Sequence, residues 1–400
     1  MNKGVGMIGR EFLHSPGPTH IPDRVLRAMQ RQPLDLVDAR LKQIMLSCFD
    51  DLRAVFRTGG EIFIYAANGH GGWEAALANL CVPGDVVLVP EVGHFSTNWA
   101  EHARALGLTT ELVQGDWRHA VDPSHVEEHL RRDFGGRIKA VLAVQVDTAT
   151  GIANDIPAIR AAIDAAGHPA LLVVDTIASL GAMPFEMDAW GVDVAIAASQ
   201  KALMCPPGLA IVAANARALD TSKGLARQQR YWDWGPRLGE EAYMKFNGTM
   251  PEHLLFALRE ALDIIKEHGL PAMFRRHKLL AGTVHRALEV WSEGGALSFN
   301  ALVPDQRSVS VTTIRTAEGI DADRLRTHAR ETLAVSVAGG LGTLQKKVFR
   351  IGHLGDLNEA MVLGCLAALE VAFIELKIPH GSNGVRAAVE YLADQRAAAA

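Results

Sequence analysis

The chain has 400 residues, of which 48% are hydrophobic and 21% charged, an ordinary globular composition with enough length for two domains. Its formal net charge of -5 gives no basic footprint for nucleic acid, and no apolar run approaches the roughly 20 residues that span a bilayer. The first residues are too poor in apolar side chains for a signal peptide. We therefore expect a cytoplasmic protein that binds neither nucleic acid nor membrane.

The cysteines lie far apart along the chain. Their spacing fits neither a disulfide framework nor a zinc site. We expect free, buried thiols and no bound metal. The positions are Cys48, Cys81, Cys205 and Cys365.

Short apolar runs alternate with amphipathic stretches through the first half of the chain. Continuous apolar character predicts strands of a sheet that is covered on both faces. A helix is predicted to begin at Asn154 and Asp155, with Pro157 near its start, and to stop at Gly167. This alternation predicts an α/β fold with a mainly parallel sheet. The predicted strands are residues 61–66, 85–90, 138–144, 170–175, 192–198 and 208–214.

The pattern changes after a helical stretch over residues 251–268, where Gly269 and Pro271 predict a break. Beyond it, residues 308–316 alternate like a half-exposed strand, and residues 360–376 read as a long apolar helix. The change predicts a second domain of α+β type. We expect an N-terminal arm over residues 1–20, a large α/β domain over 21–268 and a smaller α+β domain over 269–400.

Two charged residues follow predicted strands, at the edge where α/β sheets usually bind ligands. Asp175 closes one run; taken alone, it is more often a helix cap or part of a structural ion pair. Lys201 follows another; taken alone, it is more often a solvated chain end. A desolvated lysine can instead have a lowered pKa and act as a Schiff-base amine.

A glycine-rich turn over residues 68–74 follows the first predicted strand and opens a helix. Glycines there let backbone N–H groups approach a phosphate. The spacing is neither a P-loop nor the dinucleotide pattern, which disfavours a nicotinamide dehydrogenase. Together, the phosphate turn, Asp175 and Lys201 are what pyridoxal phosphate requires. The turn would hold the phosphate, Lys201 would form the Schiff base and Asp175 would keep the pyridine nitrogen protonated.

On these residues the sequence resembles the class V (fold type I) aminotransferases, in particular the alanine/serine–glyoxylate aminotransferase group. The resemblance implies bound pyridoxal phosphate and a mainly parallel, seven-stranded type of sheet with helices on both faces. It also implies a smaller C-terminal domain and a homodimer with a shared active site. It runs from Pro16 to about Gly355, and is most specific over residues 69–79, 147–156, 173–210 and 347–355.

The resemblance implies a role for each matching residue. Lys201 would carry the cofactor and transfer the proton, and Asp175 would pair with the pyridine nitrogen. Arg350, in an otherwise apolar strand, would grip the substrate carboxylate. The other implied cofactor contacts are Gly69, His70, Gly71 and Gln200 at the phosphate, Phe95 on the ring, Thr148 near its phenolic oxygen, and Thr249 at the phosphate of the neighbouring subunit.

Several positions depart from the family's pattern, and they surround the cofactor residues rather than replace them. Residues 246–248 lack the His or Tyr that usually precedes the threonine, and residues 33–38 lack a His-Arg-Ser-like stretch. His70 stands where a small hydroxyl residue is usual. Trp232 and Trp234 suit packing at a subunit contact at least as well as substrate contact. These changes leave the amino donor open.

The implied reaction is ping-pong transfer of an amino group from alanine, serine or a similar amino acid to a small 2-oxo acid such as glyoxylate or pyruvate. Aspartate, ureidoglycine, or pyridoxamine with pyruvate remain alternative donors. A desulfurase or related lyase is disfavoured, because Gln200 rather than His precedes Lys201 and no cysteine occurs between Cys205 and Cys365. A non-catalytic binding protein would not be expected to keep the lysine, the aspartate and the arginine together.

Overall fold

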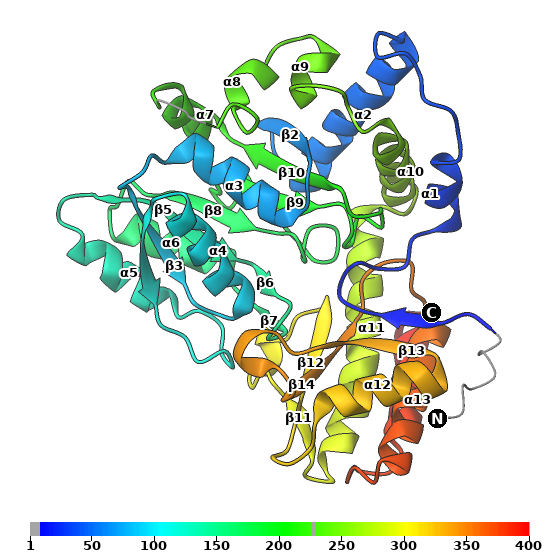
Figure 1. Ribbon diagram of the computed structural model, residues 1–400. Coiled ribbons are helices and arrows are strands. Elements are labelled where there is room, and N and C mark those ends of the chain that lie inside the picture. The colour runs from blue at the N-terminus through cyan, green and yellow to red at the C-terminus, as the bar shows by residue number, and fades with distance from the viewer. Residues whose placement is uncertain (1–8, 226–228, 400) are drawn as a thin grey trace.

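A computed structural model describes residues 9–225 and 229–399 of the protein. Two large β-sheets organise them, a seven-stranded sheet in the upper half of Figure 1 and a five-stranded sheet in the lower half. A two-stranded ribbon of β6 (Val146–Asp147) and β7 (Ile152–Ala153) lies between the two sheets. Within these residues, no helix is both long enough and apolar enough to cross a membrane.

The seven-stranded sheet is mainly parallel. β10 alone runs in the opposite direction to the other six strands, and so pairs antiparallel with β2 and β9. All six apolar runs of the sequence form strands here, so the predicted α/β fold is confirmed. β4 was not predicted, because it lies at the sheet edge and most of its side chains are partly exposed. The strand order is β2 (Glu61–Ala66), β10 (Leu209–Ala214), β9 (Val194–Ala198), β8 (Leu171–Asp175), β5 (Ile138–Val144), β3 (Val86–Pro90) and β4 (Thr109–Val113).

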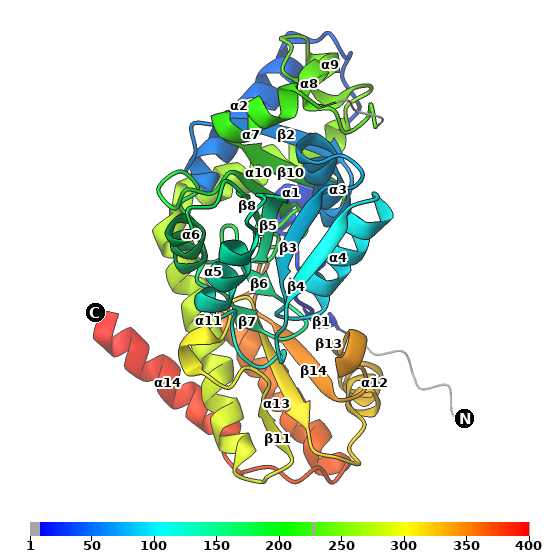
Figure 2. The same ribbon diagram turned by 90° about the vertical axis from the view of Figure 1, so that its left-hand side faces the viewer.

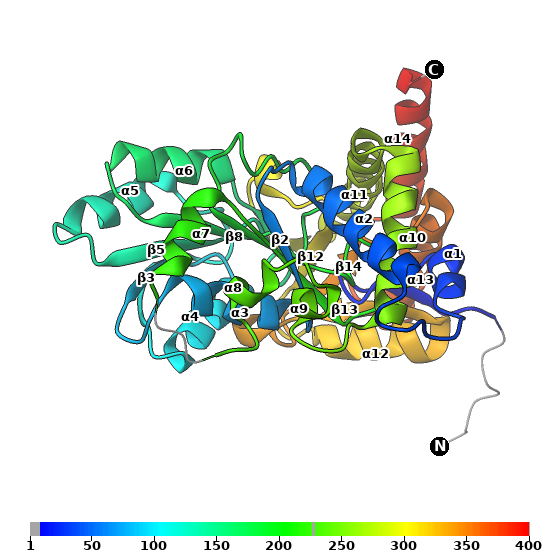
Figure 3. The same cartoon turned by 90° about the horizontal axis from the view of Figure 1, so that it is seen from above.

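Helices cover both faces of this sheet (Figures 2 and 3). Their buried residues fall into two hydrophobic clusters, one on each face. Gly72 lets one helix approach the sheet closely, because a Cβ there would lie 2.7 Å from Ile196. One face carries α2 (Ala39–Phe56), α5 (Pro123–Arg132), α6 (Ile156–Ala165) and α10 (Glu252–His268), and the other carries α3 (Gly69–Leu80), α4 (His94–Ala105) and α7 (Ala216–Lys223).

The second sheet has a mixed topology and packs with helices in one hydrophobic cluster. β1 pairs parallel with β13, so residues of the predicted N-terminal arm join this sheet. The division into domains at residues 20 and 268 stays a prediction. The strand order is β1 (Phe12–His14), β13 (Val335–Gly339), β14 (Val348–Gly352), β12 (Val311–Thr316) and β11 (Leu297–Phe299), packed with α11 (Leu270–Ser292), α12 (Ala322–Leu333), α13 (Glu359–Glu375) and α14 (Gly384–Ala399).

Local sequence signals determine several element boundaries. α6 begins where predicted, and the Asp155 side chain accepts a hydrogen bond from the N–H of Ala158. Gly269, with φ of 77°, turns the chain from α10 into α11. The strand predicted over residues 308–316 is shorter than expected, because Ser310 donates its N–H to Ser308 Oγ and forms a turn instead. The helix predicted over residues 360–376 is α13.

Candidate active site

A cavity of about 240 Å³ lies at the carboxyl ends of the parallel strands. We call it the Lys201 cavity. Loops after β2, β3, β8 and β9 and the ribbon strand β6 supply most of its wall. Most of the site residues predicted from the sequence meet here, while Gly71, Thr249 and Arg350 lie outside the lining. The predicted residues in the lining are Gly69, His70, Phe95, Thr148, Asp175, Gln200 and Lys201.

Lys201 is held by the N-terminal segment. Its Nζ donates a 2.8 Å hydrogen bond to the carbonyl of Pro16, and the Thr19 hydroxyl donates to the Lys201 carbonyl at 3.3 Å. A Cβ on Gly17 would lie 2.5 Å from Nζ, so only glycine allows this approach. Burial and the positive charge of Arg350 lower the pKa of Lys201 to about 8. Part of the population therefore carries a neutral, nucleophilic amine near neutral pH.

Asp175 ends β8 and is 4% exposed. Its Oδ1 accepts the N–H of Ile177 at 2.7 Å, and its Oδ2 accepts the indole Nε1–H of Trp73 at 2.8 Å. Burial raises the pKa of Asp175 to about 7; the charge of Asp147 adds to this, and the two donors and Lys201 oppose it. A cationic ring nitrogen beside this carboxylate would restore its charged form.

Trp73 is the functional residue that the sequence analysis missed. It lies in the helix that opens at the glycine-rich turn, whereas Asp175 is 102 residues further along the chain. Trp73 also lines the cavity and packs its ring against those of His70 and Phe95. A tryptophan in a helix usually indicates a core position, and no spacing rule links it to a strand end.

The glycine-rich turn forms the start of α3. The side chain of Asn68 caps this helix, and its Oδ1 accepts the N–H groups of His70 and Gly71 at 3.1 and 3.3 Å. His70 Nε2 lies 3.1 Å from Asn98 Oδ1, which holds the ring between α3 and α4. A Cβ on Gly71 would lie 3.2 Å from the ring of Trp232. The unusual Trp232 thus packs directly on the turn.

Gln200 gives independent evidence for a polar ligand. Its Oε1 is buried and has no hydrogen-bond partner among the residues described. Buried polar atoms are almost always paired, with protein or with a bound group. Because Gln200 lines the cavity, this atom marks where a polar group would bind.

Phe95 and Thr148 are joined by Asp147. Asp147 Oδ2 accepts the N–H of Phe95 at 2.7 Å, and its Oδ1 accepts the N–H of Ala149 at 2.9 Å. The carboxylate therefore ties the first turn of α4 to the segment that carries Thr148. Negative charge at a helix N-terminus is favourable, which fits this position. The result is a wall in which the Phe95 ring and Thr148 both border the cavity.

Arg350 reaches the cavity wall from the second sheet. It lies on β14, is 6% exposed, and donates from Nη1 to the carbonyl of Thr148 at 2.8 Å and from Nε to that of Gly339 at 2.6 Å. A guanidinium carries five N–H groups, so others remain to hold a carboxylate. Burial lowers the pKa of Arg350 to about 10, which leaves it cationic at neutral pH.

Thr249 is not brought to Lys201 within one chain. It is exposed, and it follows α9 (Ala242–Phe246), away from the cavity lining. Phe246 is buried in the hydrophobic core of the large sheet, so its ring is taken up by packing. Within one chain, Thr249 therefore does not contribute to the Lys201 cavity.

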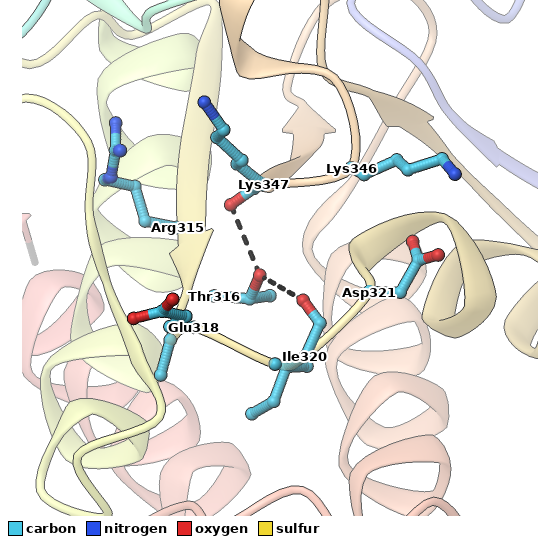
Figure 4. Close-up of a pocket in the computed structure, with 9 residues that line it drawn as sticks. Arg315, Thr316, Glu318, Ile320, Asp321, Lys346 and Lys347 are labelled. Atoms are coloured by element: carbon cyan, nitrogen blue, oxygen red, sulfur yellow. Dashed lines mark hydrogen bonds between the residues drawn. The ribbon is translucent and has the colours of Figure 1, made fainter.

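A larger hollow of about 470 Å³ lies on the second sheet and contains none of the predicted site residues. Figure 4 shows the side chains of Lys346 and Lys347 pointing in different directions. The Thr316 hydroxyl is bonded to the carbonyls of Ile320 and Lys347, at 2.8 and 3.3 Å. Because its charged groups do not converge, we take the Lys201 cavity as the candidate active site.

Comparison with known proteins agrees with this geometry. The model of the family "Aminotransferase class-V" matches residues 11–352, and the chain belongs to this family of enzymes. The serine–glyoxylate aminotransferase of Methylorubrum extorquens is 42% identical over 392 residues, 96% of each chain. The L-aspartate–glyoxylate aminotransferase of Paracoccus denitrificans is 37% identical, over 98% of this chain and 99% of the relative.

Solved structures give the same result. The pyridoxamine–pyruvate aminotransferase of Mesorhizobium loti superposes with a TM-score of 0.87 at 26% identity, over 97% of this chain and 98% of that chain. The predicted family and the fold type I architecture are confirmed. Membership of this family implies pyridoxal phosphate as the cofactor.

Proposed function

We propose that the protein catalyses pyridoxal-phosphate-dependent transamination from an amino acid such as serine or alanine to a small 2-oxo acid such as glyoxylate. The observation that carries this proposal is the meeting of Lys201, Asp175, Gly69 and His70 in one cavity, with Arg350 against its wall. Relatives that use serine or aspartate with glyoxylate support the substrate classes.

The residues of the cavity fit the cofactor. In our proposal the start of α3, with Gly69, His70 and Gly71, and the side chain of Gln200 hold the phosphate. Phe95 would hold the ring, Thr148 its phenolic oxygen and Asp175 its nitrogen. The tight fit of Gly69 supports this placement, because an added Cβ there would lie 2.4 Å from Ile177. When bound, the cofactor supplies an electron sink for negative charge at the substrate Cα.

Three side chains would then do the chemical work. Nζ of Lys201, with its lowered pKa, would take the proton from Cα of the amino donor and, in the second half-reaction, would deliver a proton to Cα of the product formed from the oxo acid. Asp175 holds positive charge at the ring nitrogen. Arg350 orients the α-carboxylate that amino donor and oxo acid share, as a guanidinium fork does well. A carboxylate-bearing donor suits Arg350 better than pyridoxamine, which has no such group.

We further propose a homodimer in which Thr249 reaches the phosphate site of the partner. Thr249 is exposed and follows α9, which lies at the top of Figure 1. Large apolar side chains are exposed in the same region, among them Tyr231, Leu238 and Tyr243. Such patches often mark protein interfaces. The free cysteines, all buried, suit the reducing cytoplasm that we propose as the compartment.

The test is spectroscopic. Purified protein supplied with pyridoxal phosphate should gain a visible absorption band, and borohydride should fix the chromophore on the peptide that contains Lys201. In a separate sample that has not been reduced, serine or alanine should bleach the band, and glyoxylate should restore it. A protein that gains no band would overturn the cofactor proposal. A band bleached by pyridoxamine or ureidoglycine, but by no α-amino acid of the proposed class, would overturn the donor proposal alone.

A further inference from the structure

A second cavity, of about 430 Å³, is lined in part by Met204, on the loop that follows Lys201. It opens between α1 (Asp23–Ala28), the end of α10 and the start of α11, which lie together in Figure 1. We call it the Arg276 cavity. It shares no lining residue with the Lys201 cavity. Its volume is within the range of small-molecule sites, and Met204, Ile264 and Met273 give it an apolar wall.

Arg276 is the unusual group in this wall. Its Nη1 donates to the carbonyls of Gly355 and Leu357, at 3.0 and 2.8 Å. Its Nη2 is buried and has no hydrogen-bond partner anywhere in the described part of the chain. Leaving a buried, charged donor unpaired is costly, and native proteins rarely do so. The free nitrogen therefore indicates an acceptor that the chain itself does not supply.

The rim of the Arg276 cavity carries the opposite charge. Asp23 and Asp356 line it, both are exposed, and neither forms an ion pair with any residue that the structure describes. Arg24 also lines the cavity, but Glu260 and Glu267 already neutralise it, at 2.7 and 2.6 Å. A simple anion would meet two carboxylates for one guanidinium. A molecule that carries a negative and a positive charge would match both the guanidinium and the carboxylates.

We propose that the Arg276 cavity binds a small zwitterion, an amino acid with an apolar side chain. Its carboxylate would accept from Arg276 Nη2, its ammonium would face Asp23 and Asp356, and its side chain would cover the apolar wall. The charge pattern, the unpaired nitrogen and the volume support this class of ligand together. The binding site is argued from residues outside the Lys201 cavity; its expected effect on the visible band rests on the function proposed above.

Backbone hydrogen bonds connect residues that line the Arg276 cavity to Lys201 and to the N-terminal segment that contacts it. Met204 lines the Arg276 cavity, has φ of 56°, and donates its N–H to the carbonyl of Lys201 at 3.0 Å. Asp356 in turn donates its N–H to His20, next to the Thr19 that contacts Lys201. A ligand in the Arg276 cavity would therefore press on the loop that positions the lysine. We expect it to shift the pH dependence of the visible band.

The test measures binding to the holoenzyme by calorimetry. The probe is N-methyl-L-leucine, a zwitterion whose secondary amine cannot be transaminated. Arg276→Gln removes the unpaired guanidinium, and Ala272→Phe fills the cavity while leaving Arg276 in place. Arg275→Gln is the matched control, because Arg275 is the exposed neighbour on the same helix and does not line the cavity.

We expect one saturable site in the wild type and in Arg275→Gln, binding weakened by roughly tenfold or more in Arg276→Gln, and no binding in Ala272→Phe. Ala272→Phe decides the matter if Arg276→Gln does not fold. No saturable binding to the wild type at millimolar concentrations would overturn the proposal. Equal binding in all variants would assign the probe to another site and would overturn it as well.

Discussion

The indole of Trp73 donates a 2.8 Å hydrogen bond to Oδ2 of Asp175, and thereby joins the first turns of α3 to the end of β8. The helix that opens at the phosphate turn is thus linked directly to the carboxylate proposed to face the ring nitrogen. Trp73 also opposes, by this bond, the rise that burial causes in the pKa of Asp175. Its position makes it a residue that orients Asp175, rather than one that contacts substrate.

Trp73→Phe should keep the packing and remove the donor. A hydrogen bond to a charged group contributes about 1.5–3 kcal/mol, so we expect kcat to fall roughly tenfold to a hundredfold. The pH profile should shift upward, because Asp175 loses a donor that favours its charged form. Trp99→Phe is the control: Trp99 is stacked on Trp73 at 5.5 Å, is equally buried, and its Nε1 has no described partner. An equal loss in both variants would show that only packing is involved.

Asp175→Asn should change how the stability of the cofactor-free protein depends on pH. The pKa of Asp175 is raised from 3.8 to about 7 in the folded chain, so unfolding releases a proton between these values. The wild type should therefore lose stability, relative to Asp175→Asn, as the pH rises from about 4 to about 7. Three pKa units correspond to about 4 kcal/mol in total. Urea unfolding of both proteins at several pH values measures this. Parallel curves would contradict the raised pKa.

Much of the scaffold could be predicted because its physical signals are local. Runs buried on both faces are continuously apolar, so the strands that end near Asp175 and Lys201 stood out in the sequence. Among the strands that were missed, β1 is three residues long and β4 lies at a partly exposed edge. Neither carries the pattern of a central strand.

In the candidate site, too, some residues could be predicted from local signals and others could not. Lys201 and Asp175 lie at the ends of buried strands, and Arg350 interrupts an apolar strand. A charged residue in each of these positions is unusual, and this predicts a site residue. Their roles remain proposals, but the structure places the first two in one cavity and the third against its wall. Contacts such as that of Trp73 with Asp175 join side chains from separate elements. No spacing in the sequence encodes them.

Gly17→Ala should disturb Lys201 directly. The added Cβ would lie 2.5 Å from Nζ, so the lysine side chain or the N-terminal segment would have to shift. We expect kcat/KM to fall at least tenfold, or about 1.4 kcal/mol, with little change in global unfolding. Gly9→Ala is a matched control, because Gly9 also has a positive φ, of 123°, but nothing within 4 Å of an added Cβ. Similar losses in the two variants would point to backbone strain rather than contact with Lys201.

Arg350→Lys should separate substrate binding from cofactor binding. Lysine keeps the positive charge but loses the planar fork, along with the bonds to the carbonyls of Thr148 and Gly339. We expect KM for both the amino donor and the oxo acid to rise by roughly tenfold to a hundredfold, because the proposed carboxylate contact is shared by both. The visible band and the pH at which it titrates should change much less, since Arg350 only adds to the burial that lowers the pKa of Lys201.

Steady-state kinetics with each substrate varied in turn, alongside a spectrophotometric titration, measure the two effects on one preparation. If KM rises for the donor alone, Arg350 does not hold the carboxylate of the acceptor. If neither KM changes, its place against the cavity wall is structural only.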